Sequence, residues 1–154
     1  MTLWEGKRFS VVLADGREVA ETRDAVAVVA LDAEGRVVLV RQLREAAGER
    51  LLELPAGLID ADETPLETAR RELREETGLR GGEWRELASF WSSPGFTNER
   101  VWVFQATLLE EGEPEPDDGE DLELVRWARE EIEARVHEIA DATTLVGLLL
   151  YLRG

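Results

Sequence analysis

The sequence contains no cysteine and only one histidine, His137. Without thiols the chain can form neither disulfides nor thiolate metal sites, and it offers no cysteine nucleophile. One imidazole is too few for a multi-histidine metal centre. A serine nucleophile would depend on His137, which lies in a stretch that we expect to form a C-terminal surface helix. Acid–base or metal chemistry in this chain must therefore use carboxylates.

Long hydrophobic runs and positive charge are also scarce. No segment approaches the roughly eighteen consecutive apolar residues of a membrane span, and residues 1–10 lack the apolar core of a signal peptide. The formal net charge is −16, with Lys7 as the only lysine, which opposes binding to a nucleic-acid backbone. We expect a cytoplasmic protein of one domain, without membrane or nucleic-acid partners, because 154 residues suffice for one core.

Apolar, β-branched segments separated by turn residues predict an α+β fold. A short hairpin should turn at Asp15-Gly16, because glycine accepts positive φ. Strands and helices then alternate without a strict βαβ pattern, which favours a mixed sheet with helices on its faces. We interpret residues 1–24 as an N-terminal hairpin segment and residues 25–154 as one structural unit. The further strands are predicted within residues 25–43, on both sides of a turn at 32–35, and within 51–57, 83–93, 99–110 and 121–128, before two C-terminal helices.

One helix is marked at both ends. Thr64 is suited to be its N-cap, Pro65 its first residue, Glu67 the second half of a capping box, and Gly78 the residue after its end. A spacing of about 100° per residue gives it a narrow apolar stripe for packing on a sheet. The stripe comprises Leu66, Ala69, Leu73 and Thr77, and Arg70 and Arg74 lie on one flank.

Three carboxylates crowd the other flank of this helix. Glu72 faces Glu76 at i+4 and Glu75 at i+3, and like charges at these spacings destabilise a helix. A solvated charged surface is the ordinary interpretation, but the segregation of charge favours a compensating cation. Oxygen ligands alone suit Mg²⁺ or Mn²⁺. Arg71, one turn before Glu75, would hold that carboxylate in a charge-assisted pair and fix its direction.

Residues 57–79, GLIDADETPLETARRELREETGL, resemble the Nudix box, G-x(5)-E-x(7)-R-E-U-x-E-E-x-G-U, at every defined position. The resemblance implies the Nudix fold, an α/β/α sandwich with a mixed central sheet, here with a short N-terminal β-hairpin. In that family the box binds divalent cations that grip a diphosphate. Two to three Mg²⁺ or Mn²⁺ ions would be bound by the Ala56 carbonyl oxygen, Glu72, Glu75 and Glu76.

The flanking segments resemble the ADP-ribose pyrophosphatase branch of the family. Pro94, in SSPGFTNE, and Arg44, before LLELPAG, occupy positions typical of that branch, in which the arginine contacts a substrate phosphate. The resemblance further implies that Glu99 lies near the terminal ribose or the metals. The other residues that it places at the substrate are Phe96, beside the bound molecule, Arg17 and Glu18, at the adenine-bearing end across a dimer interface, and Phe9, which would stack on the base.

The implied reaction is attack of water on the diphosphate of ADP-ribose, giving AMP and ribose 5-phosphate. Without a cysteine or a suitable histidine, the base is a carboxylate. Glu75 and Glu76 are candidates in the helix, and Asp118 and Glu120 are candidates in an acidic loop that is otherwise a solvated linker. Arg71 completes the predicted catalytic set.

Two other functions stay open at this point. The first is hydrolysis of another nucleoside diphosphate, such as FAD, a nucleotide sugar or a dinucleoside polyphosphate. From a different class, the protein would be a non-catalytic nucleotide sensor of the same fold, although such modules usually lose box glutamates. The resemblance implies a homodimer, while the short N-terminal region leaves open whether its strands are swapped.

Overall fold

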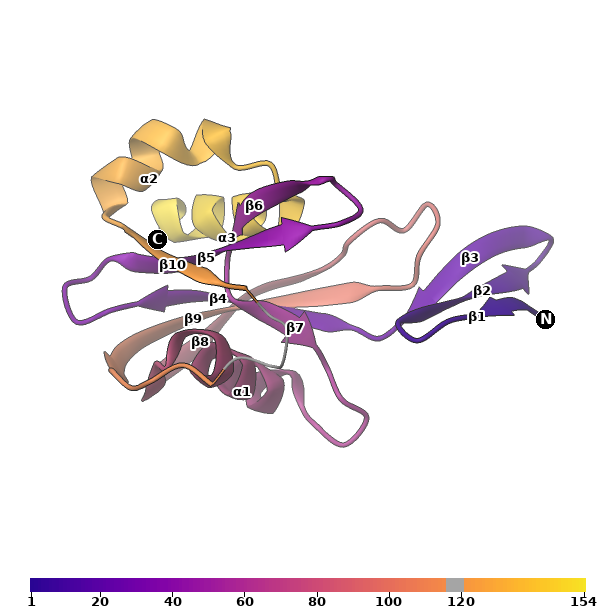
Figure 1. Cartoon of the computed structure of the whole chain (residues 1–154), viewed down its shortest axis with the longest axis horizontal. Coiled ribbons are helices and arrows are strands. Elements are labelled where there is room, and N and C mark those ends of the chain that lie inside the picture. Colours follow the sequence, from indigo (N-terminus) through magenta and orange to yellow (C-terminus); the bar gives the residue numbers. More distant parts are fainter. Residues whose placement is uncertain (116–120) are drawn as a thin grey trace.

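The computed structural model describes residues 1–115 and 121–154 and contains two separate sheets (Figure 1). The smaller sheet has the order β1-β2-β3 and is entirely antiparallel. Its hairpin turns at Asp15 and Gly16, whose φ angles of 47° and 77° confirm the predicted turn. The predicted hairpin is present, and it is preceded by a third strand that is too short to show alternation in the sequence. The strands are β1 (Thr2–Glu5), β2 (Phe9–Ala14) and β3 (Arg17–Thr22).

The central sheet is mixed, as predicted. Its order is β10-β5-β4-β9-β8, in which β4 and β9 are parallel and the other neighbours antiparallel. The strand predicted over residues 51–57 is instead two strands, because Pro55 has no N–H for a ladder. They pair with different neighbours, β6 with β5 and β7 with β4. The strands are β4 (Ala25–Leu31), β5 (Val37–Arg44), β6 (Glu49–Glu53), β7 (Ala56–Leu58), β8 (Arg80–Trp91), β9 (Arg100–Glu110) and β10 (Glu123–Trp127).

Helices cover both faces of the central sheet, which gives the predicted α/β/α sandwich (Figure 1). Successive side chains of β4 point to opposite faces. Val28 therefore packs with Leu73 of α1, while Val29 packs with Leu148 of α3. None of the helices in the described ranges is long and apolar enough to cross a bilayer. The helices are α1 (Pro65–Thr77), α2 (Arg129–Arg135) and α3 (Ala142–Arg153), with a short 3₁₀ helix at Val136–Glu138.

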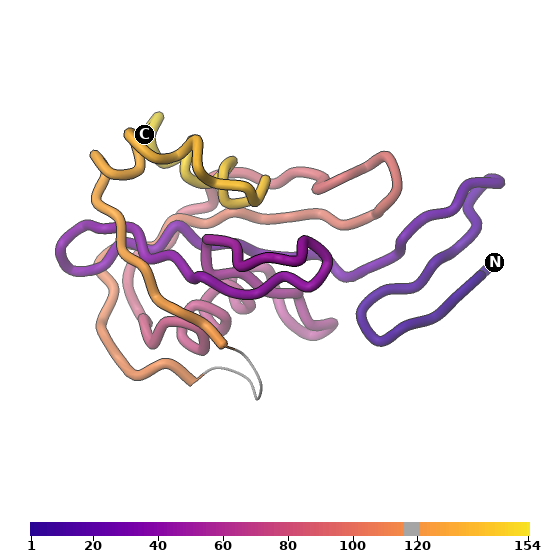
Figure 2. Tube along the Cα trace, turned by 45° about the horizontal axis from the view of Figure 1, so that its top comes forward, coloured from indigo at the N-terminus to yellow at the C-terminus, as the bar shows by residue number. Residues whose placement is uncertain are grey.

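The N-terminal sheet projects from the body of the molecule (Figures 1 and 2). It is tied to the loop between β8 and β9 by two hydrogen bonds. The backbone N–H of Ala20 donates to the Phe96 carbonyl at 2.8 Å, and the N–H of Thr22 donates to Asn98 Oδ1 at 2.9 Å. These bonds hold the start of β2 and the end of β3 beside the central sheet.

Candidate active site

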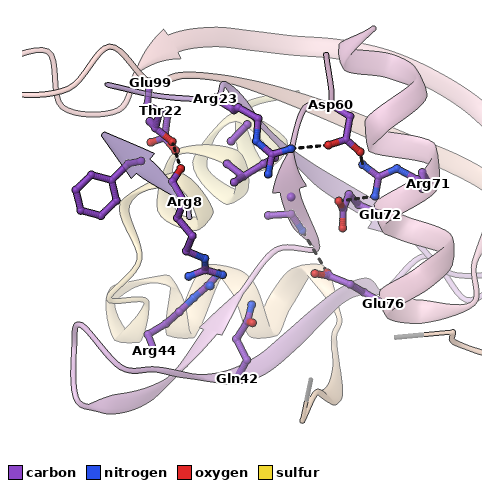
Figure 3. A pocket seen from close by; sticks show the side chains of 15 residues that line it. Arg8, Thr22, Arg23, Gln42, Arg44, Asp60, Arg71, Glu72, Glu76 and Glu99 are labelled. Atoms are coloured by element: carbon purple, nitrogen blue, oxygen red, sulfur yellow. Dashed lines mark hydrogen bonds and ion pairs between the residues drawn. The ribbon is translucent and has the colours of Figure 1, made fainter. Parts of the chain in front are cut away.

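A cavity of about 500 Å³ lies where β7, the flank of α1 and the N-terminal sheet meet (Figure 3). Its lining is divided by charge. In Figure 3, the guanidinium groups of Arg8 and Arg44 lie across the cavity from the carboxylates of Glu72 and Glu76. The lining also includes Arg23, Arg71, Asp60 and Glu99.

The ends of α1 fix how the helix presents its carboxylates. Thr64 Oγ1 accepts from the N–H of Glu67 at 3.3 Å, while the Thr64 N–H donates to the Glu67 carboxylate at 2.8 Å, so the predicted capping box is confirmed. Gly78 ends the helix in the left-handed region at φ 77°. With Leu73 buried against the sheet, Glu76 is turned to the edge of the sheet, beside β7.

Glu76 is the most deeply buried acid of the box, with 5% of its surface exposed. Its Oε2 accepts from the backbone N–H of Ala56 at 3.2 Å. The structure therefore places the carboxylate next to the residue whose carbonyl the sequence assigned to metal binding. Glu72 and Gly57 line the same cavity.

Gly57 allows β7 to pass directly against Glu72. A Cβ atom built on Gly57 would lie 2.0 Å from Cδ of Glu72 and 2.6 Å from its Cγ. Any side chain at this position would therefore push the carboxylate away from the cavity. The first glycine of the box is needed here for close approach rather than for a left-handed backbone.

We predict that Gly57→Ala lowers activity much more than stability. The added methyl meets the flexible end of Glu72, which can move at small energetic cost, but the carboxylate then leaves its place. Displacing a group that orders metal ligands typically costs about 10–100-fold in metal affinity or activity. Titration of activity with Mg²⁺ should show a raised half-saturating concentration with a nearly unchanged melting temperature. An unaltered Mg²⁺ requirement would contradict the role given to this contact.

Arg71 is the centre of a carboxylate network beside the cavity. Its guanidinium donates to both oxygens of Glu63 at 2.9 Å, to Glu72 at 2.8 Å and to Glu75 at 3.1 Å. The contact with Glu75 confirms the predicted pairing, and the contacts with Glu63 and Glu72 extend it. The guanidinium therefore compensates part of the negative charge of the crowded carboxylates.

The same network sets the ionisation of Glu63. Hydrogen bonds from Arg71, and then from the Thr68 hydroxyl, lower the pKa of Glu63 from 4.5 to about 2. The pKa of Arg71 is raised, chiefly by its hydrogen bonds to Glu63. Glu63 is one of the box positions to which the sequence gave no separate role. The structure gives it one, as the group that anchors Arg71 from the loop before α1.

The oxygen atoms of the box carboxylates are ligands of the kind that a hard divalent cation prefers, but these side chains do not surround a single point. Over residues 1–115 and 121–154, no three acidic or histidine side chains converge closely enough to hold an ion as they stand. Glu72 and Glu76 share the cavity, whereas Glu75 is held outside it by Arg71 and, at 3.7 Å, by Arg74. An all-oxygen donor set suits Mg²⁺ or Mn²⁺. To join Glu72 and Glu76 in binding an ion, Glu75 would have to turn from Arg71 toward the cavity.

The arginine side of the cavity contains one residue that the sequence predicted and two that it missed. Arg44 lines the cavity while its Nε donates to the buried Glu53 at 2.8 Å, and this hydrogen bond raises the pKa of Arg44. Arg8 has no carboxylate partner in the described part of the chain, and Arg23 pairs with Asp60. No periodicity or motif marks Arg8 or Arg23, because the folding of the N-terminal sheet brings them here.

The remaining predicted substrate residues divide into two groups. Phe9 and Glu99 line the cavity, and the Phe9 ring lies 5.4 Å from that of Trp4. Phe96 is 59% exposed on the loop between β8 and β9, outside the cavity lining. Arg17 and Glu18 are exposed on β3, also outside it. Their predicted role across a dimer interface stays a prediction.

The two acidic-loop candidates for the base, Asp118 and Glu120, lie outside the described residues. Just before them, the backbone N–H of Glu115 donates to the carbonyl of Glu75 at 2.8 Å. The described part of the loop therefore runs along the C-terminal end of α1. His137 lies in the 3₁₀ helix, with its side chain exposed, at a distance in sequence and fold from the cavity.

Comparison with known proteins identifies similar chains. A family model for the NUDIX domain matches residues 21–144. An ADP-ribose pyrophosphatase of Mycobacterium tuberculosis is 44% identical over 138 residues, which cover 86% of this chain and 67% of that protein. An ADP-ribose pyrophosphatase of Bacillus subtilis is 38% identical over 138 residues, covering 85% of this chain and 73% of that protein.

The fold is also that of a solved structure described as an ADP compounds hydrolase. The two superpose with a TM-score of 0.83, over 99% of this chain and 89% of the other, at 24% sequence identity. At this identity the likeness concerns the fold alone. It extends to nearly the whole chain, including the N-terminal strands, which lie before the region matched by the family model.

Proposed function

The chain belongs to the NUDIX domain family, and we propose that it hydrolyses the diphosphate bond of ADP-ribose to AMP and ribose 5-phosphate. One observation carries the proposal. The box carboxylates Glu72 and Glu76 face Arg44 and Arg8 across a single cavity, which suits a substrate whose diphosphate lies between the two walls. The names of the similar proteins from M. tuberculosis and B. subtilis support ADP-ribose as the substrate.

The chain's own groups would bind and orient the substrate. Arg44, already positioned by Glu53, and Arg8, which has no carboxylate partner among the described residues, would donate to phosphate oxygens in charge-assisted hydrogen bonds. Phe9 would pack on the base, where its ring is 44% exposed. Glu99 would lie near the terminal ribose or the metals. These contacts hold the diphosphate against the carboxylate wall, where the chemistry takes place.

NUDIX hydrolases generally depend on divalent metal, which would neutralise the phosphate charge and make water a better nucleophile. We propose two to three Mg²⁺ or Mn²⁺ ions, held by the Ala56 carbonyl with Glu72, Glu75 and Glu76. Glu75 or Glu76 would accept the proton of the attacking water, with Asp118 and Glu120 as the other candidates for this base. Arg71 acts as a positioning residue, because its guanidinium donates hydrogen bonds to Glu72 and Glu75 and so fixes the direction of these carboxylates.

We also propose that the protein acts as a homodimer. The N-terminal sheet leaves Leu3 and Trp4 exposed, by 47% and 53%, and Arg17 and Glu18 are exposed outside the cavity lining of their own chain. A second copy packed on this sheet would cover Leu3 and Trp4 and bring Arg17 and Glu18 to its neighbour's cavity. A cytoplasmic location stays a prediction from composition.

The direct test is a product assay. With Mg²⁺, the purified protein should convert ADP-ribose to AMP and ribose 5-phosphate, resolved by ion-exchange chromatography. FAD, a nucleotide sugar and a dinucleoside polyphosphate should be cleaved more slowly at the same concentration. Failure to form AMP at high enzyme concentration, with cleavage of another member of this panel, would overturn the substrate but not the reaction. No cleavage of any member would favour the non-catalytic sensor.

We predict that Mg²⁺ or Mn²⁺ raises the melting temperature. Ions that bind only the folded state at one hundred times their dissociation constant add about 2.7 kcal/mol of stability. For a domain of this size, that corresponds to about 5–10 °C. Differential scanning fluorimetry with and without metal measures the shift. The double variant Glu72→Gln/Glu76→Gln is the control and should lose most of it, and an equal shift in wild type and variant would place the ion elsewhere.

A further inference from the structure

A second cavity lies on the flank of α1 that faces away from the box carboxylates. It has a volume of about 310 Å³. Arg70 and Arg74 of α1 line it from one side, and Arg80 and Trp84 of β8 line it from the other. None of these four residues lines the first cavity or occupies a defined position of the box. Arg71 of the box lines both cavities, and its guanidinium already donates to Glu63, Glu72 and Glu75.

The charge of this cavity opposes that of the whole protein. Within the described ranges, no carboxylate lies within 4.0 Å of the guanidinium of Arg70 or Arg80, and Arg74 has only the 3.7 Å contact with Glu75. The one acid in the lining, Glu67, already accepts from the N–H and hydroxyl of Thr64 at 2.8 Å. The cavity is therefore locally cationic in a chain of net charge −16, which focuses a positive potential inside it.

The two helix arginines also repel each other. Arg70 and Arg74 are four residues apart, a spacing at which like charges destabilise a helix. On the opposite flank of α1 the crowded acids are compensated by Arg71. On this flank the described carboxylates are Glu67, which is already bonded to Thr64, and Glu75, which is 3.7 Å from Arg74, so the arginines are only partly compensated. A bound anion would supply that compensation.

Trp84 gives the cavity a fixed wall. Its indole N–H donates to the carbonyl of Gly81 at 2.8 Å, and its ring packs edge-on to Phe104 with centroids 6.5 Å apart. The guanidinium of Arg70 lies 5.8 Å from the ring centroid, within range of a cation–π contact. Arg70 is thereby held over the cavity while, within residues 1–115 and 121–154, no carboxylate lies within 4.0 Å of its guanidinium.

From this geometry we propose that the second cavity binds the phosphate group of a small molecule. Four guanidinium groups from two elements line one space, and those of Arg70, Arg74 and Arg80 present planar N–H donors that suit the oxygens of phosphate. Among the described residues the site shares Arg71 alone with the proposed hydrolytic site, and its occupancy does not depend on metal or on turnover. The phosphate group could belong to inorganic phosphate, pyrophosphate or a nucleoside monophosphate, and separate titrations with each of these ligands distinguish them.

Isothermal titration calorimetry on the full chain, with a chelator present and at low ionic strength, tests this proposal. Inorganic phosphate, pyrophosphate and AMP are titrated separately, and at least one should bind with one-to-one stoichiometry. Arg70→Gln and Arg80→Gln should each weaken that binding about tenfold, because a hydrogen bond to a charged group contributes about 1.5 kcal/mol. Arg153→Gln, an exposed arginine at the end of α3, is the matched control and should bind as wild type does.

Two titration results would overturn the proposal. One is the absence of binding by all three ligands at millimolar concentration. The other is binding that survives Arg70→Gln and Arg80→Gln but is lost in Arg44→Gln, which would place the anion in the first cavity. The indole N–H resonance of Trp84, assigned with Trp84→Phe, should shift on binding. A resonance that stays in place while the anion binds would also contradict the site. None of these measurements involves ADP-ribose hydrolysis, so they fail or succeed independently of the proposed function.

Discussion

Glu76→Gln should lower kcat/KM for ADP-ribose by about 10²–10⁴-fold, the usual effect of losing a group that acts on the reacting proton or charge. Glutamine keeps the size of the side chain, and its amide oxygen can still accept from the Ala56 N–H as Oε2 of Glu76 does at 3.2 Å. The fold is therefore expected to persist. What is lost is one negative charge, 5% exposed, at the wall of the cavity. Kinetics with ADP-ribose at saturating Mg²⁺ measure the effect.

The control for this variant is Glu130→Gln, which removes an exposed carboxylate from α2 and should leave the rate unchanged. Two further readouts separate the roles open to Glu76. If it binds metal, raising the Mg²⁺ concentration should restore part of the activity. If it is the base, the acidic limb of the pH profile should disappear while the Mg²⁺ requirement stays the same. Wild-type activity in Glu76→Gln would exclude both roles.

Local signals explain why α1 was predicted correctly to the residue. Thr64, Pro65 and Gly78 act on the backbone next to them, so their effects need no knowledge of the rest of the fold. The strand after β5 was predicted less well, because its break at Pro55 depends on two different neighbours, β5 and β4. β1 was missed for a similar reason, since four residues carry little periodicity and the strand is recognisable only by its pairing with β2.

The same distinction applies to the site. Glu72, Glu76 and Arg44 were placed on the cavity by resemblance, and the structure brings them together there. Arg8 and Arg23 were not predicted, because they reach the cavity only through the docking of the N-terminal sheet on the loop between β8 and β9. Helical spacing predicted one partner of Arg71.

Another partner of Arg71, Glu63, lies in the loop before α1, eight residues earlier in the sequence, where helical spacing predicts no contact. The Arg71 network was thus the part of the site that sequence reasoning described least completely. Because the Arg71 guanidinium offsets the charge of box acids, the physical interpretation of the helix also changes. Crowded carboxylates there do not by themselves require a metal ion, so metal binding rests on the family and on the ligand chemistry.

Arg71→Gln should lower the free energy of unfolding by about 2–3 kcal/mol at pH 7, the scale of losing charge-assisted hydrogen bonds in a partly buried network. The side chains involved are largely covered, since Arg71 is 26% exposed and Glu63 is 22% exposed. The variant leaves Glu63, Glu72 and Glu75 close together without their counter-charge. Activity should fall as well, because these carboxylates lose their orientation. Urea unfolding measures the stability, and the double variant with Glu63→Gln closes a thermodynamic cycle.

The coupling energy from that cycle should depend on pH in a defined direction. The pKa of Glu63 is lowered from 4.5 to about 2 in the folded protein, so its stabilising contribution is complete above pH 4.5. It is lost as the pH falls from there toward 2, because the folded carboxylate then takes up the proton that the unfolded one already holds. The coupling should therefore be constant from pH 7 to pH 5.5 and decrease below about 4.5. A coupling that keeps its full value at pH 3.5, while the protein is still folded, would show that the Glu63–Arg71 pair does not account for the stability lost in Arg71→Gln.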